Sequence, residues 1–237
     1  MTGRPKGASA VMARRSEPLD SLDDFPTPPF ATRALCEEVL PQLGASLRGL
    51  HVHEPACNRG QMAEALKEYT RRVTAEDVFP YGYGGVRDFT DTMLDPYRRE
   101  PNWIITNPPF NKAAAFLDRG LAVARDGVAL LCRTSWLEGQ ARYAEIFSSN
   151  PPTAVAVFTE RVPMFRARLD ASSASATSYS WFVWLKGVEA PPRLLWVPPC
   201  RDRLKRPGDY VFPTEREAAR RRDLRLGTPI FSGNAFA

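Results

Sequence analysis

The sequence predicts an α/β fold in which helices cover a mostly parallel sheet. Segments rich in β-branched and aromatic residues alternate along the chain with segments whose apolar residues recur at helical spacing, and this alternation is typical of a parallel sheet. The last two expected strands follow one another without a helix and can form an antiparallel edge. A chain of 237 residues buries one sizeable core, so one domain with appendages is expected.

The expected elements follow from periodicity, in chain order. The first helix covers residues 30–43, where the apolar residues recur at helical spacing at Ala34, Leu35, Val39, Leu40 and Leu43. The other helices are expected at residues 61–70, 112–125 and 139–147. The strands that can be read from the sequence are expected at residues 47–56, 71–78, 102–106, 127–137, 153–158 and 178–187.

Charge is distributed unevenly along the chain. The formal net charge is +5, with +3 in residues 1–18 and +4 in residues 200–237, which leaves a mildly acidic body. We expect residues 1–23 to be a basic, disordered tail, residues 24–199 to form the folded domain and residues 200–237 to be a basic C-terminal extension. Basic ends favour attraction to a polyanion such as DNA or RNA. The alternative is that they are only solvated.

Composition disfavours several classes of protein. No uninterrupted apolar run approaches the ~20 residues of a membrane-spanning helix, and the first residues do not resemble a secretory signal, so a cytoplasmic protein without a membrane partner is expected. His51 and His53 share one face of an expected strand but have no obvious third ligand, so no metal site is expected. Disulfides and zinc are not indicated, because the cysteines stand far apart at Cys36, Cys57, Cys132 and Cys200.

The turn after the first strand has the composition of a ligand-binding turn. It reads EPACNRG, residues 54–60, and lies at the carboxyl end of a strand, where parallel sheets bind ligands. Asn58 and Gly60 tolerate positive φ, which lets the backbone bend tightly towards a ligand, although similar turns often bind nothing. Asp77 ends the next strand about twenty residues later, at the spacing of a carboxylate that binds ribose hydroxyls.

The charge of this turn indicates what kind of cofactor it would accept. Glu54 would repel a pyrophosphate, and the sequence contains no phosphate-binding Walker motif. The predicted cofactor is therefore a nucleoside without phosphates, and a positive charge on it would suit the turn.

The motif NPPF, residues 107–110, ends another expected strand and points to amine chemistry. Two prolines continue neither a strand nor a helix, so they force a fixed bend and leave carbonyls without competing N–H donors. Asn107 and the Pro108 carbonyl then offer two acceptors side by side, which suits an amino group on an aromatic ring or a carbonyl. Phe110 offers a face on which a planar substrate can stack. The alternative is a proline turn with Phe110 in the core.

Five short motifs occur in the order DFPTPP, EPACNRG, AEDV, RDF and NPPF. With them the sequence resembles the amino-group methyltransferases of the S-adenosylmethionine-dependent superfamily, and the phage-type DNA N6-adenine methyltransferases in particular, over residues 24–187. The resemblance implies a Rossmann-like methyltransferase fold with a mostly parallel seven-stranded sheet, helices on both faces and an antiparallel strand near the C-terminal edge. It also implies S-adenosyl-L-methionine as the cofactor and N6 of adenine in DNA as the target.

The same resemblance implies a role for each matched residue. The catalytic residues would be Asn107, Pro108, Pro109 and Phe110, of which Asn107 and the Pro108 carbonyl would accept hydrogen bonds from the target amine. Around the cofactor, Thr27 would contact the methionine end, Asp77 the ribose hydroxyls, and Asp88 with Phe89 the adenine. The complete implied cofactor set is Thr27, Glu54, Pro55, Ala56, Cys57, Asn58, Gly60, Asp77, Val78, Asp88, Phe89 and Asn107.

The sequence departs from the family pattern in two places. Asn58 stands where the first glycine of the turn is usual, and asparagine is the residue that best tolerates left-handed geometry after glycine. No obvious target-recognition domain follows the NPPF motif. Any sequence specificity would therefore come from the basic C-terminal extension and from loops such as residues 161–179, in which Arg161, Arg166 and Arg168 would lie near the substrate.

Other functions fit the same motifs. NPPF-type motifs also occur in methyltransferases that act on adenine N6 or guanine N2 in RNA, or on the N5 amide nitrogen of glutamine in proteins, because the planar amine is the same. The basic ends favour a nucleic acid over a protein. A noncatalytic nucleic-acid-binding protein that retains the fold is the remaining alternative, and it is disfavoured because binding alone does not need two amine acceptors.

Overall fold

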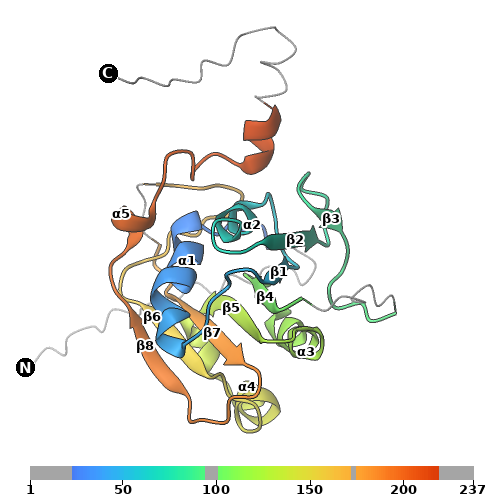
Figure 1. The fold of residues 1–237 in the computed structure, drawn as a ribbon, viewed down its shortest axis with the longest axis vertical. Helices are drawn as coiled ribbons and strands as arrows, with labels where there is room; N and C mark the ends of the chain where they lie inside the picture. Colours follow the sequence, from blue (N-terminus) through green and yellow to red (C-terminus); the bar gives the residue numbers. More distant parts are fainter. Residues whose placement is uncertain (1–22, 94–100, 172–174, 219–237) are drawn as a thin grey trace, which may run out of the picture.

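The structure is a computed structural model, and it describes residues 23–93, 101–171 and 175–218. Eight strands form one sheet in the order β3-β2-β1-β4-β5-β7-β6-β8, with helices packed against it (Figure 1). The predicted N-terminal tail, except its last residue, and the final part of the predicted C-terminal extension lie outside the described residues.

The sheet is mostly parallel, as predicted. Strands β3, β2, β1, β4 and β5 run parallel to one another, whereas β7 is antiparallel to both β5 and β6, and β8 pairs in parallel with β6. The bounds are β1 His51–Glu54, β2 Arg72–Asp77, β3 Gly85–Val86, β4 Trp103–Thr106, β5 Gly127–Arg133, β6 Ala154–Phe158, β7 Tyr179–Leu185 and β8 Arg193–Val197. The antiparallel strand near the C-terminal edge is thereby confirmed.

The sheet has eight strands rather than the expected seven. The two strands that the sequence did not reveal are β3 and β8. β3 has only two residues, too few for any periodicity to show. β8 is a five-residue strand between two pairs of prolines, which are turn and breaker signals in a sequence.

The predicted helices are present but shorter or less regular than expected. Residues 30–43 form α1, a π-helical turn η1 and a 3-10 turn η2, and the segment ends at Gly44, whose φ is 69°. Residues 139–147 likewise divide into α4 and the π-helical η4. The bounds are α1 Pro29–Ala34, η1 Leu35–Val39, η2 Pro41–Leu43, α2 Gln61–Leu66, α3 Ala113–Val123, η3 Thr134–Leu137, α4 Gln140–Arg142, η4 Tyr143–Phe147 and α5 Arg201–Leu204.

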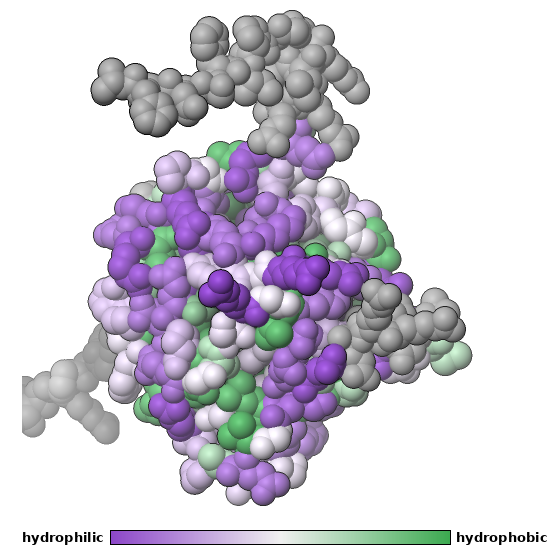
Figure 2. All heavy atoms as spheres, viewed as in Figure 1, coloured by the Kyte–Doolittle hydropathy of each residue, from purple (hydrophilic) through white to green (hydrophobic). Residues whose placement is uncertain are grey.

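Helices cover both faces of the sheet, as predicted, with α1 and α2 on one face and α3 on the other (Figure 1). The strands serve two apolar layers because alternate side chains point to opposite faces. On β4, Trp103 and Ile105 pack into the layer with Phe30 of α1, while Ile104 packs with Phe116 of α3. In Figure 2, hydrophilic side chains cover most of the surface over α1 and α2.

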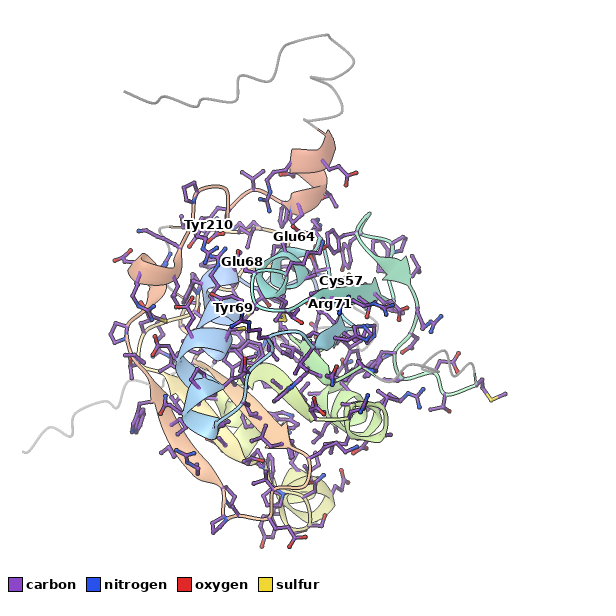
Figure 3. The ribbon with its side chains drawn as sticks, in the orientation of Figure 1. Cys57, Glu64, Glu68, Tyr69, Arg71 and Tyr210 are labelled. Atoms are coloured by element: carbon purple, nitrogen blue, oxygen red, sulfur yellow. The ribbon has the colours of Figure 1, made fainter. Side chains whose placement is uncertain are left out.

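The described part of the C-terminal extension is fastened to the body by a buried arginine. Arg33 of α1 donates to both carboxylate oxygens of Asp209, at 2.7 and 2.9 Å, and to the Leu204 carbonyl at 2.7 Å. Its remaining bonds go to the carboxylate of Glu68, labelled in Figure 3, which also pairs with Arg206 at 2.8 Å. The chain after β8 therefore returns across α1 towards the end of α2.

Two negative findings hold for the described part of the chain. None of its helices has the length and apolar character needed to span a membrane. It also contains no group of three or more histidine, cysteine, aspartate or glutamate side chains placed to bind a metal ion.

Candidate active site

A cavity of about 280 Å³ opens beyond the carboxyl ends of β1, β2 and β4. Strand order places these three strands side by side, so turns that are far apart in the sequence meet there. The residues of the predicted site that line the cavity are Thr27, Glu54, Pro55, Ala56, Cys57, Asn58, Asp77, Val78, Asp88, Phe89, Asn107 and Pro109. Gly60, Pro108 and Phe110 belong to the same turns but are not among the lining residues.

Sequence reasoning missed several other lining residues. They are Asp23, Phe25, Gln61, Met62, Tyr81, Arg87, Asn111, Lys112 and Phe116. Most of them lie inside the recognised motifs or directly beside them, so a wider window around each motif would have included them. Tyr81 lies between motifs, and no local signal in the sequence marks it.

The first turn has the backbone geometry that its composition predicted. Asn58 and Gly60 have φ of 50° and 92°, so the substitution of asparagine for the usual glycine keeps the left-handed conformation. A Cβ on Gly60 would meet the Tyr83 ring at 2.4 Å, so this position also needs glycine for space. Cys57, labelled in Figure 3, lies in the same turn.

Asp77 supports this turn from the end of β2. One carboxylate oxygen accepts from the backbone N–H of Asn58 at 2.9 Å, and the other accepts from the backbone N–H of Phe79 at 3.0 Å. Burial raises the pKa of Asp77, although these backbone N–H groups favour its charged form. Each oxygen keeps acceptor capacity, so the carboxylate can hold the turn and bind a ligand hydroxyl.

Glu54 is a buried carboxyl group at the end of β1. The residue is 2% exposed, and no described group forms a hydrogen bond with its Oε2 atom. Burial, and next the nearby carboxylate of Asp77, raise the pKa of Glu54 well above its usual range. A cationic ligand group in the cavity would supply the missing partner and stabilise the charged form.

Asp88 and Phe89 form the wall next to α3. The Asp88 carboxylate accepts from the backbone N–H of Thr90 at 2.9 Å and from its hydroxyl at 2.6 Å, and Lys112 lies 3.4 Å away. Although partial burial opposes ionisation, these contacts lower the pKa of Asp88. The Phe89 ring packs between His53 and Phe116, with ring centroids 5.8 and 5.2 Å away. This wall combines an anionic acceptor with an apolar face.

The segment before α1 connects the turns that surround the cavity. The Asp24 carboxylate accepts from the Asn58 side chain at 2.8 Å. It also forms a bidentate ion pair with the Arg59 guanidinium, at 2.8 and 3.0 Å. Asp23 accepts from the backbone N–H of Phe110 at 2.7 Å. The EPACNRG turn and the NPPF turn are therefore both hydrogen-bonded to the same short segment.

Asn107 presents a defined atom to the cavity wall. Its side-chain nitrogen donates to the Phe25 carbonyl at 3.1 Å and lies 3.8 Å from the Met164 sulfur. Its side-chain oxygen is buried, and within the described ranges it has no hydrogen-bond partner. A buried acceptor without a donor is costly, so this oxygen is a candidate to receive a ligand N–H.

Phe110 is half-buried and does not line the cavity. Its ring centroid lies 5.4 Å from that of Phe25 and 6.4 Å from that of Tyr179. The guanidinium carbon of Arg133 lies over the ring, 4.1 Å from the centroid. The predicted stacking face therefore has a planar cation against it.

The loop after β6 also reaches this edge of the sheet. The backbone N–H of Ala167 donates to the Asp24 carbonyl at 2.7 Å, so the loop is attached to the same segment as the two turns. Its three arginines, Arg161, Arg166 and Arg168, are exposed.

The likeness of the chain to known proteins is structural. No family model and no curated protein matches the sequence. A Pyrococcus horikoshii protein described as a "putative RNA methyltransferase" is 18% identical with a TM-score of 0.52, and the match covers 73% of this chain and 92% of that one. A type I restriction-modification methyltransferase subunit from Streptococcus thermophilus is 10% identical with a TM-score of 0.54, covering 89% of this chain and 55% of the subunit.

A third solved structure, from Vibrio vulnificus, is described as a "modification subunit of a putative type I restriction enzyme". It is 12% identical with a TM-score of 0.52, and the match covers 85% of this chain and 53% of that chain. The chain thus spans about half the length of the two restriction-modification subunits. At these identities the comparison establishes the fold, and the chain has the Rossmann-like α/β fold found in methyltransferases.

Proposed function

We propose that this protein is an S-adenosylmethionine-dependent methyltransferase that acts on an exocyclic amino group, N6 of adenine in DNA. The observation that carries the proposal is the Asn107 side chain, whose nitrogen donates to the Phe25 carbonyl and whose buried oxygen has no partner in the described part of the protein. The hydrogen bond to Phe25 orients the amide, so the acceptor is available before any substrate arrives.

The chemistry of an aromatic amine explains why such an acceptor is useful. The nitrogen lone pair is delocalised into the ring, so the amine is a poor nucleophile while it stays planar. Two acceptors that hold both amine hydrogens favour the pyramidal geometry in which the lone pair is localised, and they act most strongly in the transition state. Asn107 is neutral and is not a strong base, so we expect the amine proton to pass to solvent after transfer.

The cavity residues fit the proposed cofactor. The unpartnered carboxylate oxygen of Glu54 would accept from the methionine ammonium group, Asp77 would accept from the ribose hydroxyls, and Asp88 with Phe89 would bind the adenine. The cofactor would supply a methyl group already activated by its attachment to a sulfonium. The protein's own work is then to bind, to orient the amine and to exclude competing water.

Two other substrate classes need the same acceptors, namely bases of RNA and the glutamine side chain of a protein. The exposed arginines Arg133, Arg161 and Arg166 favour a polyanion over a protein amide. A noncatalytic binding role is disfavoured. A buried acceptor without a donor lowers the stability of the protein, and binding alone does not require the Asn107 oxygen to be left in that state.

The test is transfer of a labelled methyl group from the cofactor to separate pools of DNA, RNA and protein. We expect label in DNA, at N6 of adenine, and more label in single-stranded or mismatched DNA than in a matched duplex, because the base is unstacked at lower cost. Asn107→Ala should abolish most of the transfer while cofactor affinity stays nearly unchanged. Asn150→Ala, which removes an exposed asparagine, is the matched control and should retain activity.

The outcomes separate the candidates. Label only in RNA or only in protein would replace the DNA assignment but keep the amine chemistry. Transfer by Asn107→Ala at the wild-type rate would refute the acceptor role. Binding of DNA without transfer to any pool would favour the noncatalytic function.

A further inference from the structure

Arg133 lies over the ring of Phe110, the residue proposed to stack on the substrate. It is the last residue of β5 and is exposed, and its guanidinium carbon is 4.1 Å from the Phe110 ring centroid. Tyr179 is its partner across the β5–β7 ladder. The rings of Phe25 and Tyr179 meet the Phe110 ring at tilts of 46° and 36°, and the guanidinium of Arg133 lies over the ring.

A guanidinium and a nucleobase compete for such a face. Both are flat and delocalised, and both carry hydrogen-bond donors at their rims. Arginine stacks well on aromatic rings, and nucleobases stack on them too. A base cannot take the face that Arg133 covers while the guanidinium remains there.

We infer that Arg133 is a specificity-determining residue that occupies the base-stacking face of Phe110 in the empty protein and leaves it when a nucleotide base enters. This inference rests on the proposed function and deepens it. The released guanidinium is a cation with several hydrogen-bond donors. A substrate with phosphates next to the target base offers that charge a new partner, whereas an isolated base or an uncharged amide does not.

This exchange would make the protein selective for a base that is part of a nucleic-acid strand. Displacing Arg133 opposes the entry of every planar amine, and only a phosphate-bearing substrate compensates by binding the displaced guanidinium. The position of Arg133 supports this role, since β5 lies next to β4 in the sheet and β4 leads into Asn107. Arg133 thus distinguishes substrates by what surrounds the amine, while Asn107 and Phe110 bind the amine and its ring.

The decisive experiment compares one variant on two substrates. Arg133→Ala removes both the competitor and the phosphate partner. For adenosine, which has no phosphate, we expect tighter binding and a lower KM, by about threefold or more. For a single-stranded oligonucleotide we expect a higher KM, and a slope of log KM against log salt that is smaller by about 0.7. Arg48 is an exposed arginine before β1. Arg48→Ala is therefore the charge-matched control, and it should leave the KM of both substrates unchanged.

A second variant separates stacking from charge. Arg133→Lys keeps the charge but lacks the planar group that stacks on the ring, so we expect it to bind adenosine more tightly than the wild type and to retain most of the oligonucleotide affinity and salt slope. In the wild type, NMR of the Arg133 side-chain Nε–H should show an upfield ring-current shift that disappears when adenosine is added. This readout requires no turnover.

Each outcome decides between the alternatives. If Arg133→Ala weakens the binding of adenosine and of the oligonucleotide alike, Arg133 supports the stacked base instead of competing with it. The inference is then wrong, although the proposed methyl transfer stands. If neither the wild type nor the variants transfer methyl groups, but adenosine removes the ring-current shift of the Arg133 Nε–H, the proposed reaction is wrong and the exchange on Phe110 holds. If adenosine binds and leaves the signal in place, the exchange is refuted independently of activity.

Discussion

The side-chain nitrogen of Asn107 donates to the Phe25 carbonyl at 3.1 Å, and this bond determines which Asn107 atom remains to accept a ligand hydrogen. We predict that Asn107→Asp loses both stability and methyl transfer, although it keeps an acceptor oxygen. Its second carboxylate oxygen would face the Phe25 carbonyl without a donor between them. We expect the free energy of unfolding to fall by about 1–3 kcal/mol and turnover to fall by about a hundredfold or more, measured by urea unfolding and methyl transfer.

Asn107→Ala is the comparison for this variant, because it removes the acceptor without adding a charge. We expect it to lose turnover but to unfold at a urea concentration nearer to that of the wild type. Equal stability of Asn107→Asp and the wild type would show that the bond to Phe25 does not orient the amide.

The buried carboxyl of Glu54 predicts proton release when the cofactor binds. Its pKa is raised in the free protein, so the group is neutral over a pH range in which an exposed carboxyl is charged. Pairing with an ammonium group requires the charged form, so binding expels a proton and tightens as pH rises towards the raised pKa. Calorimetry in buffers of different ionisation enthalpy measures the protons released.

Glu54→Gln is the matched variant for this prediction. It should release no proton at this site and bind the cofactor more weakly at high pH. Without cofactor, the wild type should lose stability relative to this variant as pH rises above the ordinary carboxyl pKa, because the unfolded chain ionises Glu54 first. Identical proton release in the two proteins would place the ammonium elsewhere.

Asp77 holds the EPACNRG turn and is proposed to bind the cofactor, and one substitution tests both roles. Asp77→Asn keeps the shape but turns an amide N–H₂ towards one of the two backbone N–H groups, those of Asn58 and Phe79, that now donate to it. We expect the cofactor affinity to fall by about tenfold or more, since a hydrogen bond to a charged group contributes about 1.5–3 kcal/mol. Calorimetry measures this, and Asp91→Asn, at an exposed position, is the control. Unchanged affinity would remove Asp77 from the site.

Local sequence signals predicted the parts of the fold that depend on local chemistry. The apolar runs of β4 and β5 and the two turns at the cavity could be read directly, because burial on both faces and positive φ restrict residue choice at each position. The contacts of Phe25 with Asn107, and of Arg133 with Phe110, could not. They join residues far apart in the chain through a backbone carbonyl and an exposed arginine, neither of which leaves a pattern in the sequence.

The C-terminal extension shows the same limit. Its basic composition was evident, but its attachment depends on Arg33, which lies in a helix whose other residues are all apolar or small except Thr32. A lone arginine in a helix normally indicates a solvated face, and only the tertiary structure shows that Asp209 and Glu68 neutralise it.

This buried pair gives the last prediction, which concerns stability. The side chains of Arg33 and Asp209 are 4% and 8% exposed, so Asp209→Ala removes a partner from a buried charge, which typically costs about 3–5 kcal/mol. Glu68 and the Leu204 carbonyl still accept from Arg33, so we expect a loss of about 2–3 kcal/mol in the free energy of unfolding, at or below the lower end of that range. A loss of this size lowers the Tm by about 4–12 °C in a chain of this length.

Asp202→Ala in α5 removes a carboxylate that is 92% exposed and pairs only locally with Lys205, so it should leave the urea midpoint unchanged. If the two variants unfold alike, the pair with Arg33 does not hold the C-terminal segment to α1, and its attachment would depend on the packing of α5 instead.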